Sequence, residues 1–110
     1  VKFISFHFKP FYGIYKGENC QGVKIIITDK KEYRPVAVQY LILGILKSLY
    51  PKTFMYRLKK SSKKMFCMVN GTDKVYEILV KEKFPAWKLI EFQKNQHKDF
   101  FKKRKKYLLY

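Results

Sequence analysis

Residues 23–28 constrain the fold of this chain more than any other segment. They read Val-Lys-Ile-Ile-Ile-Thr, and their β-branched side chains favour an extended backbone. Apolar residues on both faces predict a central strand that is buried on both sides. Gly17 and Gly22 precede this run and predict a tight turn or a bulge. The first part of the chain is therefore expected to contain a sheet built around a strand at residues 22–28.

Two candidate functional side chains follow this strand. Asp29 comes directly after it, and its carboxylate can accept a backbone N–H as a turn or cap residue. Arg34 precedes Pro35, which suits the first turn of a helix because proline has no N–H to leave unpaired. Sheets of the α/β type place ligands at such strand-to-helix junctions. Asp29 and Arg34 are thus candidate site residues, and the alternative interpretation is a turn cap and a structural ion pair.

The whole pattern predicts one domain of 110 residues with an α+β fold. We expect a small mixed sheet and about three helices, in the order β-β-α-β-β-α-α. The expected strands are residues 1–8, 22–28, 54–58 and 65–69, and the expected helices are residues 35–50, 73–81 and 85–103. Thr72 is the expected N-cap of the second helix.

The last residues, Tyr107-Leu108-Leu109-Tyr110, are too apolar for a free tail. We expect them to dock on the sheet or to complete a surface between domains. Cys20 and Cys67 are the only cysteines, and buried free thiols explain them better than a disulfide. No apolar run is long enough to predict a membrane span.

The chain is strongly basic, with 25 Lys and Arg against 8 Asp and Glu and a net charge of +17. Such a charge suggests nucleic acid or an anionic surface as a partner. The lysines are nevertheless scattered along the whole chain, which is typical of the compositional drift of an AT-rich genome. Basic charge alone gives only sequence-independent attraction to nucleic acid. A small nucleic-acid-binding protein that uses residues 59–64 and 102–106 remains the alternative function.

The sequence contains no recognisable catalytic or metal-binding constellation. His7 and His97 are isolated, and two cysteines alone do not make a zinc site. The eight carboxylates fall mostly at predicted turns, caps and helix surfaces. There is no phosphate-binding loop, no dinucleotide fingerprint and no nucleophile elbow.

An ordered set of short motifs resembles the exo-β-N-acetylmuramidase (NamZ-type) family. The motifs are Phe8-x-Pro10, Gly17-Glu18-x-Cys20-x-Gly22-Val23-x-Ile25, Thr28-Asp29, Tyr33-Arg34-Pro35-Val36, Leu49-Tyr50-Pro51, Phe54-x-x-Arg57, Gly71-Thr72-Asp73 and Arg104-x-x-Tyr107-Leu108-Leu109-Tyr110. They extend over essentially the whole chain, and they correspond to the C-terminal domain of that family.

The resemblance implies an accessory domain at residues 1–110 and a Rossmann-like N-terminal catalytic domain that is absent here or encoded separately. The intact enzyme is expected to remove terminal N-acetylmuramic acid from peptidoglycan fragments, without a metal or organic cofactor. This chain alone is expected to be inactive. Pro10, Asp29 and Arg34 are the residues implied at the substrate cleft or domain interface. The N-terminal part would decide whether this bacterial protein acts in the cytoplasm, the periplasm or outside the cell.

Overall fold

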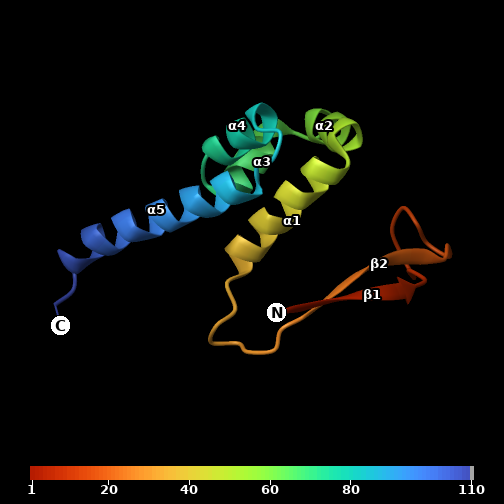
Figure 1. The fold of residues 1–110 in the computed structure, drawn as a ribbon, viewed down its shortest axis with the longest axis horizontal. Coiled ribbons are helices and arrows are strands. Elements are labelled where there is room, and N and C mark those ends of the chain that lie inside the picture. The colour runs from red at the N-terminus through yellow and green to blue at the C-terminus, as the bar shows by residue number, and fades with distance from the viewer. Residues whose placement is uncertain (110) are drawn as a thin grey trace. The chain divides into compact units, whose positions relative to one another are not determined.

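The computed structural model describes residues 1–109, and these form two compact units that meet in the sequence at Arg34 and Pro35 (Figure 1). The first unit is a two-stranded β-hairpin, and the second consists of helices. The α+β class is confirmed. The order of elements is β-β-α-α-α-α-α, with five helices in the described chain rather than about three.

The hairpin pairs β1 (Lys2–Phe8) with β2 (Cys20–Ile26) in antiparallel register, so that Lys2 faces Ile26 and Phe8 faces Cys20. Aromatic and β-branched residues explain why both segments are extended. The connecting loop turns at Gly17, whose φ of 79° is strained for any residue with a Cβ. The predicted turn at Gly17 is therefore confirmed.

The prediction that residues 22–28 form a central strand buried on both sides is wrong. β2 has one neighbour, β1, and the hairpin unit supplies no layer of side chains to cover either face. The Val23 side chain is 66% exposed, and Ile25 and Ile26 are also exposed. The apolar pattern is therefore present in the sequence without being buried in this unit.

Five helices make up the second unit. They are α1 (Pro35–Leu49), α2 (Pro51–Lys60), α3 (Lys63–Asn70), α4 (Lys74–Lys81) and α5 (Ala86–Lys105). α1, α4 and α5 confirm the three predicted helices with small shifts at their ends. The N-cap position of α4 is Asp73 and not the predicted Thr72, although the Thr72 hydroxyl accepts a hydrogen bond from the Lys74 N–H at 3.3 Å.

The two predicted strands at residues 54–58 and 65–69 are wrong, because these segments lie in α2 and α3. Leu58 is buried at the spacing that one helical turn gives from the half-buried Phe54. Ser62 begins α3 by accepting the Met65 N–H at 3.3 Å, and Gly71 ends it with a φ of 70°. These caps define a helix where the short apolar run alone suggested a strand.

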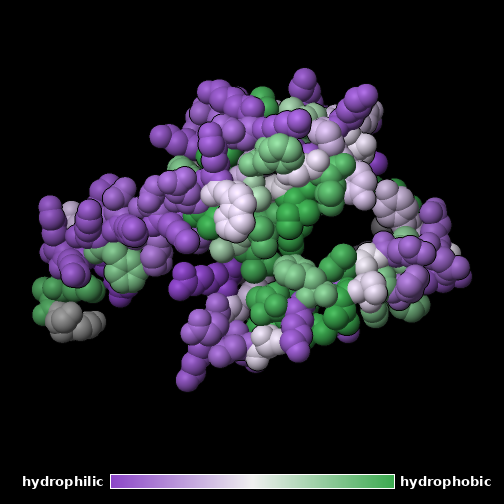
Figure 2. Space-filling view, viewed as in Figure 1, coloured by the Kyte–Doolittle hydropathy of each residue, from purple (hydrophilic) through white to green (hydrophobic). Residues whose placement is uncertain are grey.

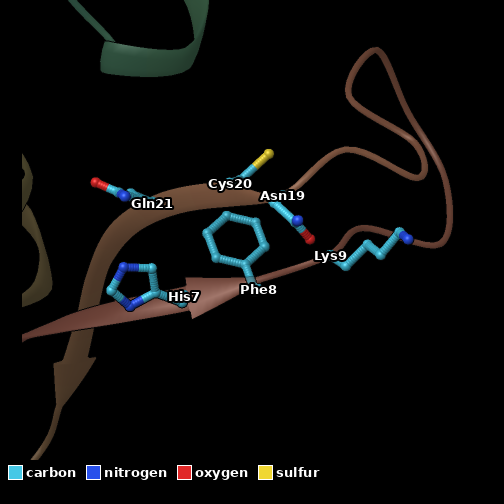
Figure 3. A pocket seen from close by; sticks show the side chains of 6 residues that line it. All are labelled: His7, Phe8, Lys9, Asn19, Cys20 and Gln21. Carbon is cyan, nitrogen blue, oxygen red and sulfur yellow. The ribbon is translucent and has the colours of Figure 1, made fainter.

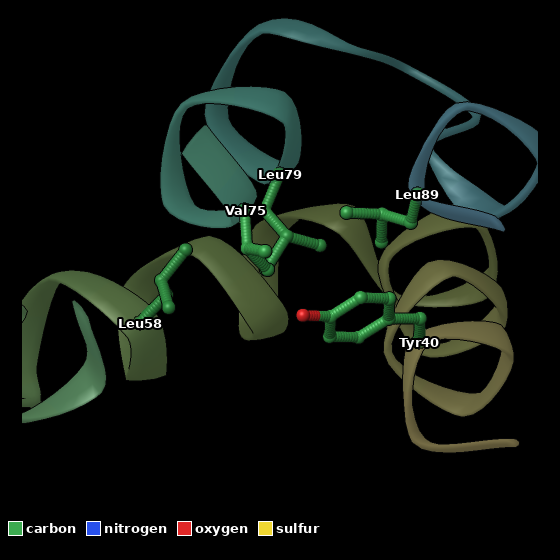
Figure 4. Close-up of a cluster of buried hydrophobic side chains, with 5 residues drawn as sticks. All are labelled: Tyr40, Leu58, Val75, Leu79 and Leu89. Carbon is green, nitrogen blue, oxygen red and sulfur yellow. The ribbon is translucent and has the colours of Figure 1, made fainter. Parts of the chain in front are cut away.

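The core of the helical unit gathers one or two side chains from each of four helices. Its buried members are Tyr40, Leu58, Val75, Leu79 and Leu89 (Figure 4). Gly44 allows α1 and α5 to approach closely, because a Cβ at this position would lie within 2.6 Å of the Ala86 backbone nitrogen. No described helix is both long and apolar enough to cross a membrane.

The predicted docking of the apolar tail on the domain is wrong for the residues that are described, and the alternative, a surface between domains, stays a prediction. Tyr107 is 83% exposed and Leu109 is 96% exposed, so their side chains find no partner in the helical unit. Tyr110 lies outside the described residues. Cys20 and Cys67 are half-buried rather than fully buried. They belong to different units, so the preference for thiols over a disulfide stays a prediction.

Candidate functional site

A shallow depression lies at the loop end of the hairpin, where β1 ends and β2 begins. Its volume is about 380 Å³. The lining residues are His7, Phe8, Lys9, Asn19, Cys20 and Gln21 (Figure 3). All six belong to the hairpin unit, so the depression is formed by one compact body.

The Phe8 ring occupies the middle of the lining residues (Figure 3). It stacks on Phe6 with ring centroids 5.9 Å apart and an interplanar angle of 16°. The Nζ atom of Lys24 lies 5.1 Å from the centroid of the Phe6 ring on the same hairpin. These contacts hold an aromatic surface beside the polar groups of the depression.

The polar groups around Phe8 comprise an imidazole, an ammonium group, two amides and a thiol. Cross-strand pairing places His7 opposite Gln21, one pair before Phe8 and Cys20. Amide side chains both donate and accept hydrogen bonds, whereas the ammonium of Lys9 only donates and carries a positive charge. Side chains alternate along each strand, so His7 and Gln21 lie on the opposite face of the hairpin from Phe8. Lys9, Asn19 and Cys20 are therefore the polar groups that can act together with the Phe8 ring on one ligand.

The structure places the predicted site residue Pro10 next to this depression. Pro10 is half-buried, and its carbonyl accepts a hydrogen bond from the Gly17 N–H at 3.0 Å. This bond closes the loop that carries Lys9 and Asn19. Pro10 therefore supports the rim of the depression and does not line it.

Asp29 and Arg34 lie beyond the other end of β2, a strand length of about 20 Å from the loop end. The Asp29 carboxylate accepts the Lys31 N–H at 2.8 Å, which is the turn-residue role that its position indicated. Arg34 is exposed, and no ion pair joins it to Asp29 in the described part of the chain. The hairpin thus does not bring Asp29 and Arg34 together with Pro10.

Sequence reasoning singled out Pro10 in this loop but did not identify the six residues that line the depression. His7 and Gln21 approach each other only through the antiparallel register, which the sequence pattern did not specify. The available signal was the alternation of His7 with Phe6 and Phe8 in β1, which places His7 on the opposite face from its neighbours.

The described residues offer no arrangement suited to acid–base or metal chemistry. No group of three or more His, Cys, Asp or Glu side chains within residues 1–109 could hold a metal ion. Seven of the eight carboxylate residues are exposed, and the half-buried Glu82 pairs with Lys88 at 2.6 Å. A general acid normally requires a carboxyl group that is shielded from water. No carboxylate lies among the six residues that line the depression.

Lys47 is a buried cation in the helical unit. Its Nζ atom donates hydrogen bonds to the carbonyl oxygens of Leu79 and, at 3.2 Å, of Val80 in the last turn of α4. Burial lowers the pKa of Lys47, and the nearby Glu82 carboxylate partly offsets this effect. Because these carbonyls end α4, Lys47 serves as a cap between α1 and α4.

Residues 1–110 match the model of a family described as exo-beta-N-acetylmuramidase NamZ, C-terminal. No curated protein and no solved structure matches the chain. The family match gives no support to the alternative of a nucleic-acid-binding protein. Because the match extends over the whole sequence, the chain belongs to the family of C-terminal domains of the exo-β-N-acetylmuramidase NamZ.

Proposed function

We propose that this domain frames the substrate cleft of a two-domain exo-β-N-acetylmuramidase and contributes binding rather than catalysis. Its partner would be a Rossmann-like N-terminal domain, in the same polypeptide or separately encoded, that carries the catalytic carboxylate. The observation that carries the proposal is the depression at the loop end of the hairpin, in a chain that belongs to this family.

The lining of the depression suits the chemistry of a terminal N-acetylmuramic acid. This sugar has a carboxylate, hydroxyl groups and an acetamido group around a ring with apolar faces. Lys9 would pair with the carboxylate, and the Asn19 amide would bind the acetamido group or a hydroxyl. The exposed face of Phe8 would pack on the sugar ring. Binding sites of this kind combine an apolar surface with a few placed polar groups.

Asp29 and Arg34 are assigned a different part of the same proposal. They lie beyond the far end of the hairpin. Arg34 is exposed, and its guanidinium forms no ion pair with any described residue. We assign both to the interface with the N-terminal domain. We assign Pro10 to the cleft, because its hydrogen bond with Gly17 supports the loop that carries Lys9.

The proposal is tested by measuring release of N-acetylmuramic acid from a chromogenic muramide. The chain alone should be inactive, and the chain combined with the N-terminal domain should be active. Lys9→Gln in the combined enzyme should raise KM about tenfold with little change in kcat, because one charged contact is lost in both ground and transition states. Lys2→Gln, an exposed lysine at the other end of β1, is the matched control.

Two results would contradict the proposal. Release of N-acetylmuramic acid by the chain alone would show that it carries its own catalytic groups. An unchanged KM for Lys9→Gln, with the Lys2→Gln control also unchanged, would show that the depression does not contact the substrate.

A further inference from the structure

The first half of α5 is anchored in the helical unit, whereas its second half extends beyond the other helices (Figure 1). Leu89 is fully buried, and the half-buried Phe92 packs against the same core. Every described residue from position 94 onward is exposed. The helix has 20 residues and is therefore about 30 Å long. Its projecting half must be stable in water or be covered by a partner.

One exposed face of α5 carries two aromatic and three basic side chains, which we call the lysine–aromatic stripe, and the carboxylate residue Glu91 lies on the same side, four residues after Trp87. Its members are Trp87, Lys94, Lys98, Phe101 and Lys105. Their spacing of i, i+7, i+11, i+14 and i+18 follows the 3.6-residue period, so they share one side of the helix. The stripe extends about 27 Å from its first to its last residue.

Both aromatic side chains of the stripe are available to a ligand. Trp87 is 77% exposed and Phe101 is 44% exposed, and neither belongs to the core. The Phe101 ring lies between His97, at a centroid distance of 4.7 Å, and the Arg104 guanidinium, 5.8 Å from its centroid. Phe101 is thus held by its neighbours on the helix while one part of its surface stays free.

The charge of α5 favours an anionic partner. Its basic residues are Lys88, Lys94, Lys98, Lys102, Lys103, Arg104 and Lys105, and its acidic residues are Glu91 and Asp99. Hydrophilic side chains cover most of the visible surface of this helix (Figure 2). Basic residues in the last turn also suit the helix dipole, but the dipole does not explain two exposed aromatic rings on the same face. Lysines and aromatics together match an anion that also has apolar faces.

We propose that the lysine–aromatic stripe binds the glycan strand of peptidoglycan, a linear polymer of sugars whose carboxylates lie on the attached peptides and on the N-acetylmuramic acid units that carry no peptide. Lysine ammonium groups would pair with the carboxylates, and the Trp87 and Phe101 rings would pack on sugar faces. The choice of polymer rests on the proposed function, although the stripe belongs to a different unit from the depression. The stripe holds the domain on the polymer, and the cleft receives the terminal sugar.

The test is co-sedimentation of this chain with purified insoluble peptidoglycan. Lys94→Gln/Lys98→Gln/Lys105→Gln should weaken retention about tenfold, since each exposed ion pair contributes modestly. The matched control, Lys52→Gln/Lys59→Gln/Lys64→Gln, removes the same charge from exposed positions on α2 and α3 and should change retention far less. Far-UV circular dichroism verifies that both variants retain their helices.

Trp87 provides a second readout because it is the only tryptophan in the chain. Soluble glycan strands should protect its fluorescence from quenching by acrylamide. Chitin, which has similar sugars without carboxylates, should neither retain the chain nor protect Trp87 to the same degree.

Equal losses in the two lysine variants would overturn the proposal, because they would show that only net charge matters. Retention on chitin equal to that on peptidoglycan would overturn it as well, and so would stripe-dependent binding of single-stranded RNA without binding of peptidoglycan. These failures would leave the effect of Lys9→Gln on KM intact. Failure of the proposed function would instead appear in the Lys9→Gln assay, whatever the sedimentation result.

Discussion

Gly44→Ala tests whether backbone contact sets the crossing of α1 and α5. Gly44 is buried in α1, and an added Cβ would lie within 2.6 Å of the Ala86 nitrogen and Cβ and closer still to the Ala86 Cα. Two of these three atoms are backbone atoms in the first turn of α5. A change of rotamer cannot relieve such a clash, so the two helices must move apart.

The magnitude follows from two opposing effects. Forcing an extra methyl group into a packed core typically lowers the free energy of unfolding by about 1–3 kcal/mol. Alanine recovers up to about 1 kcal/mol through its higher helix propensity. Because the added Cβ meets backbone atoms, the cost belongs in the upper part of its range, about 2–3 kcal/mol. The net loss of about 1–2 kcal/mol should lower the Tm by roughly 4–16 °C in a unit of this size. Leu89, three residues after Ala86, would lose part of its burial as the helices separate.

The assay is thermal unfolding followed by far-UV circular dichroism, with two controls. Gln39→Ala changes an exposed position of α1 and should leave the Tm unchanged or slightly raised. Gly44→Ala/Ala86→Gly removes the Ala86 Cβ but keeps its nitrogen and Cα, so most of the loss should persist. A wild-type Tm for Gly44→Ala, or full rescue by Ala86→Gly, would refute the assignment of this crossing to backbone contact.

Three further predictions concern the helical unit. Leu79→Ala should lower the free energy of unfolding by about 2–5 kcal/mol, because it leaves a cavity at a fully buried position, whereas the exposed Val80→Ala should cost much less; urea unfolding compares the two. Burial lowers the pKa of Lys47 below its ordinary value of 10.5, so the unfolded chain binds more protons than the folded chain in the pH range just below that value. The stability that Lys47 contributes should therefore rise with pH through that range. The free energy of unfolding of the wild type relative to that of Lys47→Met should rise with it. Tyr40, whose pKa burial raises, has the opposite effect on stability in both proteins and cancels in the comparison. Tyr107→Ser/Leu109→Ser should leave the Tm unchanged, because both side chains are exposed. A fall of several degrees would show that the tail packs against the domain, as the sequence suggested.

Long periodic segments predicted the helices well, and short apolar runs did not. Residues 35–49 and 86–105 repeat their apolar side chains over three or more turns, so α1 and α5 could be predicted. Residues 54–58 and 65–69 are too short for periodicity to separate a strand from a helix. Ser62 and Gly71 carried the deciding information, because an N-cap serine and a left-handed C-cap glycine enclose α3.

The candidate site was predicted only where it depends on local chemistry. The turn role of Asp29 and the loop around Pro10 follow from residue type and sequence position. The pairing of His7 with Gln21 depends on strand register across a loop of eleven residues, positions 9–19, and no local pattern specifies that register. A binding surface formed across two strands could therefore not be predicted from the sequence.

The hairpin shows why a correct local prediction can accompany a wrong prediction of burial. β-branched residues determine that residues 20–26 are extended, but the number of neighbouring strands decides whether their side chains are covered. An isolated two-stranded ribbon is marginally stable in water, and here Val23 and Ile25 remain exposed on it. Covering such side chains would contribute roughly 25 cal/mol per Å² of apolar surface. The pairing with an N-terminal domain that we propose accounts for this pattern, because the partner would supply the layer that the hairpin unit lacks.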